Sequence, residues 1–311
     1  MTQIKDFKNG EQVSTPLLIQ SYIKGVTQNG APYLSIVFQD NTGTIEGKWW
    51  DIPPAMEKLV AQGKIGKVNC DVLLYRNNLQ VRVHGIDFSE SYNLEDFVVS
   101  SQYSRDYLES KINHYVSLIE SPIYKQLVMG CFDYYGEDFY LYPAATRNHH
   151  DFVGGLATHV FKMAELAVKF KETYESINLD LLLSGVLVHD MGKIEEYTQA
   201  ILSEYAVQGR LLGHISIMDA RLFDIAKDLN LEHAEETMLL RHLVLSHHGQ
   251  LEYGSPVKPM VIEAELLNFI DNIDARMNMF EKMFMDVEEG EFSLRQFALE
   301  NRSFFKPKGV K

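Results

Sequence analysis

Apolar and polar residues are spaced differently in two parts of this chain, and the change falls near residue 90. Before it, apolar runs rich in β-branched and aromatic residues are separated by turn-forming residues, a pattern that predicts strands. These runs cover residues 16–26, 33–38, 44–50, 66–75 and 79–88. Between the third and the fourth run, residues 53–62 have helical spacing and begin with two prolines, which suit a first helical turn. Three strands, a short helix and two strands is the order of a five-stranded OB-fold β-barrel.

After residue 90 the apolar positions recur at helical spacing. Ser104 is placed to cap a helix that runs through Glu120, and Ser121-Pro122 begins a second helix. Further helices are predicted over residues 156–175, 180–190, 214–229, 233–246 and 260–286. The predicted fold is therefore a multidomain α and β protein: an OB-fold domain over 1–90, a helical connector over 91–145, an all-α domain over 146–300 and a basic, frayed tail over 301–311.

Composition restricts the function only loosely. The net charge is −14, but residues 1–90 are neutral and residues 91–311 carry all of the acidity, so a nucleic-acid partner is neither favoured nor excluded. No run approaches the roughly 20 apolar residues of a membrane span, and the N-terminus lacks a signal-peptide core. Cys70 and Cys131 are too far apart in sequence to suggest a disulfide framework. We expect a cytoplasmic protein with no membrane partner.

Histidines are concentrated in the helical part, with nine of the eleven between residues 149 and 248. His189 and Asp190 end a run that is apolar all round, so Asp190 should be buried, which is costly unless a positive charge meets it. Imidazoles and carboxylates without cysteine suit one or two divalent metal ions that keep positions open for water and phosphate. The candidate ligands are His159, His189, Asp190, His214, His247, His248 and Asp271.

Simpler interpretations exist for single members of this set. A lone inward histidine such as His159 is more often a hydrogen-bonded core residue than a metal ligand. Asp274 could be solvated, could pair with Arg241 or Arg276, or could orient a ligand histidine. Several separate helices each place a histidine or an aspartate at a buried or helix-terminal position. This joint pattern favours a metal site, and a metal site of this kind indicates a phosphoesterase.

The same residues resemble the signature of the HD phosphohydrolase superfamily. That signature comprises a first histidine, a His-Asp pair and a late aspartate, and His159, His189-Asp190 and Asp271 match it, with the extended form HDMGK over 189–193. The resemblance implies that these side chains bind a first metal ion. His214 and the pair His247-His248 resemble the extra histidines of two-metal members; which of the pair ligates stays open.

The resemblance extends to the YhaM family of bacterial 3′–5′ exoribonucleases and covers almost the whole chain. It is carried by an OB barrel joined to an HD domain and by four motifs: GGLATH (154–159), SHHG (246–249), YGSP (253–256) and IDNIDARMN (270–278). It implies hydrolysis of single-stranded RNA from the 3′ end to 5′-nucleoside monophosphates. Mn²⁺ is the favoured activator, with Mg²⁺, Co²⁺ or Fe²⁺ as alternatives. Single-stranded DNA as a substrate and assembly into a homo-oligomer stay open.

Two metal ions could clamp a phosphodiester, with Asp190 as the shared ligand because a carboxylate has two oxygens. Lys193 is the first candidate for a cation that meets the transition-state charge; alternatively, it is a helix C-terminal cation interacting with the dipole. Arg147, with His149 and His150, is the second candidate, and His150 could instead donate a proton.

The barrel would hold single strands by stacking bases on aromatic rings and by attracting phosphates to basic groups. Tyr33, Lys48, Trp49 and Trp50 are the candidate substrate-binding residues. Trp49 and Trp50 are adjacent on a predicted strand and must face opposite sides, so at least one belongs to the core.

Two other functions compete with the exoribonuclease. The enzyme alternative is an HD phosphohydrolase that acts on free or signalling nucleotides, the barrel serving assembly. The binding-module alternative is an OB protein whose helical part only mediates contacts. A buried Asp190 argues against the second, because an adaptor has no use for it.

Overall fold

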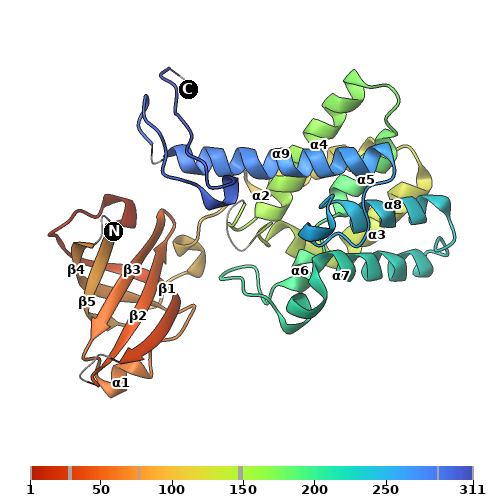
Figure 1. The fold of residues 1–311 in the computed structure, drawn as a ribbon. Coiled ribbons are helices and arrows are strands. Elements are labelled where there is room, and N and C mark those ends of the chain that lie inside the picture. Colours follow the sequence, from red (N-terminus) through yellow and green to blue (C-terminus); the bar gives the residue numbers. More distant parts are fainter. Residues whose placement is uncertain (1, 27–29, 76–77, 146–149, 286, 310–311) are drawn as a thin grey trace. The chain divides into compact units, whose positions relative to one another are not determined.

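The computed structural model describes residues 2–26, 30–75, 78–145, 150–285 and 287–309. The chain divides into two compact units, Met1–Ser100 and Ser101–Lys311, each with its own core (Figure 1). Within the described ranges, no helix has the length and apolar content needed to cross a membrane.

The first unit is a closed five-stranded barrel with the order β1-β2-β3-β5-β4 (Figure 1). Its strands are β1 (Gln12–Val26), β2 (Pro32–Asp40), β3 (Gly43–Trp50), β4 (Ile65–Tyr75) and β5 (Asn78–Asp87). Strand β1 pairs with both β2 and β4, which closes the barrel, and β3 pairs with β5 in parallel. The short helix α1 (Pro54–Glu57) connects β3 to β4, and η1 (Ile4–Asp6) precedes β1. This confirms the predicted OB-fold order, although the helix is shorter than predicted.

Alternation along the strands fills the barrel interior. Leu34, Ile36 and Phe38 on β2 are buried, whereas the residues between them are partly exposed. Gly47 on β3 leaves room for the Phe38 ring, because a Cβ at this position would lie 2.7 Å from Phe38 Cε2. Apolar inward faces therefore explain why this segment forms a barrel.

The second unit is helical. Its α-helices are α2 (Arg105–Ser117), α3 (Pro122–Tyr135), α4 (Gly155–Thr173), α5 (Leu179–Val188), α6 (Lys193–Glu196), α7 (Val207–Asp228), α8 (Glu235–Ser246) and α9 (Ile262–Met285). Short 3₁₀ turns are η2 (Leu94–Phe97) in the first unit and η3 (Gly136–Tyr140), η4 (Leu251–Tyr253) and η5 (Phe297–Leu299) in the second. Ser104 caps α2 by accepting the backbone N–H of Tyr107, as predicted, and Ser121 caps α3 in the same way through the backbone N–H of Tyr124.

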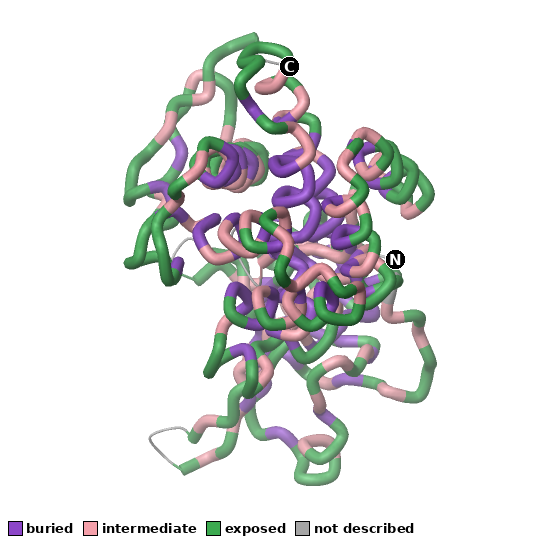
Figure 2. Tube along the Cα trace, turned by 90° about the vertical axis from the view of Figure 1, so that its right-hand side faces the viewer, coloured by how far each residue is buried: buried purple, intermediate pink, exposed green. Residues whose placement is uncertain are grey.

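Helix α5 lies at the centre of this unit, packed against α3, α4, α8 and α9. All residues from Leu181 to Val188 are buried, as a helix that is apolar on every side requires. Gly185 allows α8 to approach closely, because a Cβ here would lie 2.4 Å from Leu243 Cδ2. In the helical unit, buried and exposed residues alternate within single helical turns, as expected of helices with one packed face (Figure 2). The C-terminal end of α5, where His189 follows, is thus held inside the unit.

Several helix boundaries differ from the prediction; α2, for example, ends at Ser117 and not at Glu120. Helix α7 begins at Val207 and is broken at Gly213, whose φ of +72° departs from helical geometry, so the predicted start at residue 214 is the start of its second part. The predicted frayed tail is wrong for residues 301–309: Phe304 accepts from Ser293 N, and Lys306 Nζ donates to the carbonyls of Phe284 and Val287. These bonds hold the segment against the end of α9.

Candidate metal centre

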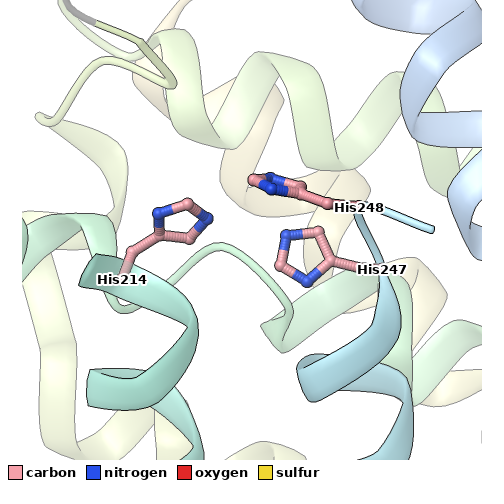
Figure 3. Close-up of side chains that lie close together, drawn as sticks. All are labelled: His214, His247 and His248. Atoms are coloured by element: carbon pink, nitrogen blue, oxygen red, sulfur yellow. The ribbon is translucent and has the colours of Figure 1, made fainter. Parts of the chain in front are cut away.

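The structure brings the seven predicted ligands into one cluster inside the helical unit. They come from five different helices or helix ends: His159 from α4, His189 and Asp190 from the end of α5, His214 from α7, His247 and His248 from the end of α8, and Asp271 from α9. Figure 3 shows His214 and the pair His247 and His248 approaching one another from their two helices. Residues far apart in sequence therefore meet at one point.

Asp190 is the centre of the cluster. Its Oδ2 lies 3.4 Å from His189 Nε2 and 3.8 Å from His159 Nε2. Its Oδ1 lies 3.4 Å from His214 Nε2 and 3.6 Å from His247 Nε2. Asp271 Oδ1 lies 3.2 Å from His159 Nε2, on the Oδ2 side. The two oxygens of one carboxylate thus face two separate sets of imidazole nitrogens.

The histidines of this cluster share one orientation: Nδ1 lies beside an oxygen acceptor and Nε2 is left toward the centre. The Nδ1 acceptors are Asp274 Oδ2 for His159 (2.6 Å), Val186 O for His189 (2.9 Å), Glu196 Oε1 for His214 (3.2 Å), Val244 O for His247 (2.7 Å) and Tyr253 O for His248 (2.7 Å). A proton on Nδ1 leaves the lone pair on Nε2, which is the form of imidazole that binds a metal ion.

Burial determines the charge state of several members. It lowers the pKa of His214 and of His247, so both imidazoles are neutral at neutral pH. Burial alone would raise the pKa of Asp190, but Lys193 and His189 hold that pKa well below its ordinary value. Burial also opposes the charged form of His159, yet hydrogen bonds to Asp271 and Asp274 raise the pKa of His159 to about 10. A metal ion at His159 Nε2 would take the place of this proton.

The donor atoms fit a divalent cation. Among the described residues, Asp190 Oδ1 and the Nε2 atoms of His189, His214 and His247 are buried without a hydrogen-bond partner. Such atoms cost about 1–3 kcal/mol each when nothing satisfies them. Sets of three donor atoms lie within 4.8 Å of one another, among them His159, His189 and Asp271, and His214, His247 and His248. A metal ion bound by these side chains would satisfy the buried atoms.

Lys193 and Asp274 extend the cluster. Lys193 is the first residue of the four-residue helix α6, is buried, and its Nζ lies 2.6 Å from Asp190 Oδ2. Asp274 accepts from His159, as predicted for a residue that orients a ligand. The arginine alternatives for Asp274 are wrong, because Arg241 pairs with Asp219 and Arg276 pairs with Glu300.

His150 does not occupy the predicted substrate-binding position. It is fully buried, its Nε2 lies 2.7 Å from Asp274 Oδ2, and its backbone N–H donates to Asn278. His150 therefore holds the carboxylate of Asp274, which in turn orients His159. The prediction that His150 contacts the substrate is wrong. Arg147 and His149, predicted beside it, lie outside the described residues.

On the barrel, Trp49 and Trp50 point to opposite faces of β3, as adjacent residues of a strand must. Trp49 is 3% exposed and belongs to the core, so its predicted substrate contact is wrong. Trp50 is 43% exposed and packs against Tyr33, with the ring centroids 4.6 Å apart and the ring planes tilted by 32°. Lys48 Nζ lies 5.9 Å from the Tyr33 ring centroid and donates to Ser35. One outer face of β2 and β3 therefore carries Tyr33, Lys48 and Trp50 together.

Two residues that contact the candidate metal centre were not predicted from the sequence. Glu196 Oε1 accepts both the backbone N–H and Nδ1 of His214. Asn268 Nδ2 donates to His247 O at 2.7 Å, fixing the turn after α8. Glu196 gave no signal, because an acidic pair after a lysine is typical of a solvated helix. Asn268 precedes Asp271 and Asp274 at intervals of three, and this spacing could have indicated a shared face of α9.

Comparisons with known proteins agree with this geometry. A family model described as the HD domain matches residues 156–276, so the fold and the cluster define an HD-domain protein. A curated relative, the 3′-5′ exoribonuclease YhaM of Geobacillus sp. (strain WCH70), is 42% identical over 307 residues, which is 98% of this chain and 94% of the relative. The chain belongs to the YhaM family. The resemblance read from its motifs is thereby confirmed.

Among solved structures, one similar chain is the second OB-fold domain of replication protein A from Methanococcus maripaludis. It is 20% identical, with a TM-score of 0.25, and the match covers 30% of this chain and 97% of that domain. The strand order of the barrel, with β3 parallel to β5, is the observation that establishes the OB-fold here.

Proposed function

We propose that this protein is a metal-dependent 3′–5′ exoribonuclease that shortens single-stranded RNA from its 3′ end and releases 5′-nucleoside monophosphates. Family membership supports this activity over hydrolysis of free nucleotides. The observation that carries the proposal is the position of Asp190, whose two oxygens face separate sets of imidazoles. A ligand shared by two metal ions is the arrangement that phosphodiester hydrolysis uses.

The cluster would hold two ions. His159, His189, Asp190 and Asp271 would bind the first; Asp190, His214, His247 and His248 would bind the second. When bound, such ions neutralise charge on the phosphate and lower the pKa of water. Mixed imidazole and carboxylate donors suit a transition-metal ion better than Mg²⁺, which prefers oxygen ligands. Among such ions, the resemblance to the YhaM family favours Mn²⁺, with Fe²⁺ or Co²⁺ as substitutes and Mg²⁺ as the weakest activator.

Lys193 would act on the substrate from beside the shared carboxylate. Its ammonium group is buried and held by Asp190, so Lys193 would lose little further side-chain entropy when the substrate binds. A fixed cation in a site from which water is excluded stabilises the negative charge that develops on a phosphoryl oxygen in the transition state. Lys193 is thus our candidate catalytic residue besides Asp190.

The barrel would bind the RNA strand upstream of the cleaved end. Trp50 offers an exposed ring, and the partly buried Tyr33 lies beside it, so bases could stack at this face without sequence preference. Lys48 on β3 lies opposite Arg82 on β5, and the exposed Arg82 adds a second cation for phosphates on this face. A cytoplasmic location is compatible with Cys70 and Cys131 being buried, unpaired thiols.

The proposal is tested with single-stranded RNA labelled at the 3′ or the 5′ end, incubated with Mn²⁺, Mg²⁺ or a chelator, and with Asp190→Ala beside the wild type. With the 5′ label we expect a ladder that shortens stepwise; with the 3′ label we expect immediate release of a labelled mononucleotide. Chelator and Asp190→Ala should abolish both. Unchanged trimming by Asp190→Ala, or hydrolysis of free nucleotides alone, would overturn the proposal.

A further inference from the structure

Glu196 is a buried carboxylate with an unusual set of partners. One oxygen, Oε1, accepts the backbone N–H of His214 at 3.0 Å and lies 3.2 Å from Nδ1 of the same residue. Within the part of the chain that the structure describes, no lysine or arginine forms an ion pair with Glu196; its ion-pair partner is His214. Burying a carboxylate is costly unless its hydrogen bonds are satisfied, so two bonds to one residue mark a specific role.

The backbone around Glu196 is built to bring it to His214. Gly209 of α7 lies against the end of α6, since a Cβ there would be 2.1 Å from Glu196 O. Gly213 breaks α7 with its positive φ, and the helix resumes at His214. The amide of His214 is therefore one of the first-turn N–H groups that no intrahelical carbonyl can satisfy, and Glu196 satisfies it. The helix dipole favours an anion at this end.

The side chains at the second proposed ion are not held alike. His247 and His248 have Nδ1 on the neutral carbonyls of Val244 and Tyr253. His214 has Nδ1 on a carboxylate, which fixes the ring and makes its Nε2 a stronger electron-pair donor. That Nε2 is aimed at the cluster, 3.4 Å from Asp190 Oδ1.

We propose that Glu196 is a positioning residue for the second metal ion: it holds His214 with the proton on Nδ1 and thereby sets the affinity of the site formed with Asp190, His247 and His248. This inference rests on the two-ion assignment of the proposed function. It concerns metal binding in the absence of RNA, so it can be tested separately from the exonuclease activity.

The test is Mn²⁺ binding to the full-length protein, followed by calorimetry and by electron paramagnetic resonance, in the wild type and in Glu196→Gln. Glutamine keeps an oxygen for the two N–H groups of His214 and removes only the charge. We expect the wild type to bind two ions, and Glu196→Gln to keep one site while the other weakens about 10- to 100-fold. The matched control is Glu195→Gln, because the neighbouring carboxylate is bound to Arg221 and Tyr135 and should leave both sites unchanged.

A spectroscopic measurement on the wild type tests whether Glu196 positions the His214 imidazole or only caps the second part of α7. Because it uses the wild type, it does not depend on whether Glu196→Gln folds. In protein with ¹⁵N-labelled histidine and no metal, the His214 imidazole should be the neutral form with its proton on Nδ1. Wild-type affinity at both sites in Glu196→Gln, equal weakening of both sites, or a wild-type His214 protonated on Nε2 would each overturn the proposal. RNA trimming that fails while these results hold would count against the proposed function alone.

Discussion

Asp274 Oδ2 lies 2.6 Å from Nδ1 of His159, and both side chains are buried. The same oxygen accepts from His150 Nε2 at 2.7 Å, so one carboxylate oxygen serves two imidazoles. His150 has a positive φ of 44°, and its amide is held by Asn278 one turn further along α9. Helix α9 therefore provides Asp271 toward the cluster and, one turn on, the support for the histidine beside it.

Asp274→Asn should weaken the site that contains His159. The amide removes the charge that holds the Nδ1 proton, and loss of such a partner typically reduces metal affinity about 10- to 100-fold. Mn²⁺ titration of the variant measures this. Asp219→Asn is the control, since Asp219 is a carboxylate bound to Arg241 away from the cluster. Equal Mn²⁺ affinity in Asp274→Asn and the wild type would contradict the role given to Asp274.

Metal binding should release protons at neutral pH. Burial opposes the charge on His159, but Asp271 and Asp274 raise its pKa from 6.5 to about 10 in the metal-free protein. The raised pKa means that the folded chain binds this proton more tightly, so its stabilising contribution is full below pH 6.5 and is lost as the pH rises through about 10. An ion at Nε2 must displace the proton, so Mn²⁺ affinity should increase over the same range. Calorimetry in buffers of different ionisation enthalpy measures the release; heats that do not depend on the buffer would exclude it.

Lys193→Ala should slow the chemical step more than it affects metal binding. Removal of a cation that stabilises transition-state charge costs about 100-fold in kcat in comparable sites. Mn²⁺ affinity should be kept or increased, because Lys193 Nζ no longer shares Asp190 Oδ2. Single-turnover trimming measured together with Mn²⁺ titration separates the two effects. A variant with normal kcat and lost Mn²⁺ binding would make Lys193 a structural residue.

The adjacent tryptophans provide a matched pair of substitutions. Trp50→Ala removes an exposed ring that packs against Tyr33, so RNA binding should weaken by about 1–3 kcal/mol with little change in stability. Trp49→Ala empties a core position and should cost about 3–5 kcal/mol of unfolding free energy. Fluorescence anisotropy with labelled RNA and urea unfolding measure the two quantities. Unaltered RNA binding in Trp50→Ala would show that this face of the barrel does not bind RNA.

Features governed by local sequence were predictable. The cap at Ser104, the helix start at Ser121-Pro122 and the succession of strands and helix in the barrel segment follow from neighbouring residues, because a cap needs only one side chain and strands show their period within a few positions. The clustering of the histidines and aspartates could be predicted because these residue types are costly to bury singly, so their joint placement at apolar positions carries information.

Features governed by tertiary packing were not predictable. His150 has the residue type of a substrate contact, and only its position behind Asp274 shows that it supports the site. Trp49 and Trp50 are indistinguishable until the inward face of β3 is known. The pairing of Glu196 with His214 depends on the approach of α6 to α7 at Gly209, which no local pattern indicates.

If two metal ions share Asp190, anomalous scattering from crystals grown with Mn²⁺ should reveal both of them. We expect two anomalous peaks, one beside Asp190 Oδ2 with His159, His189 and Asp271, and one beside Asp190 Oδ1 with His214, His247 and His248. A single peak, or two peaks that do not both contact Asp190, would contradict this expectation.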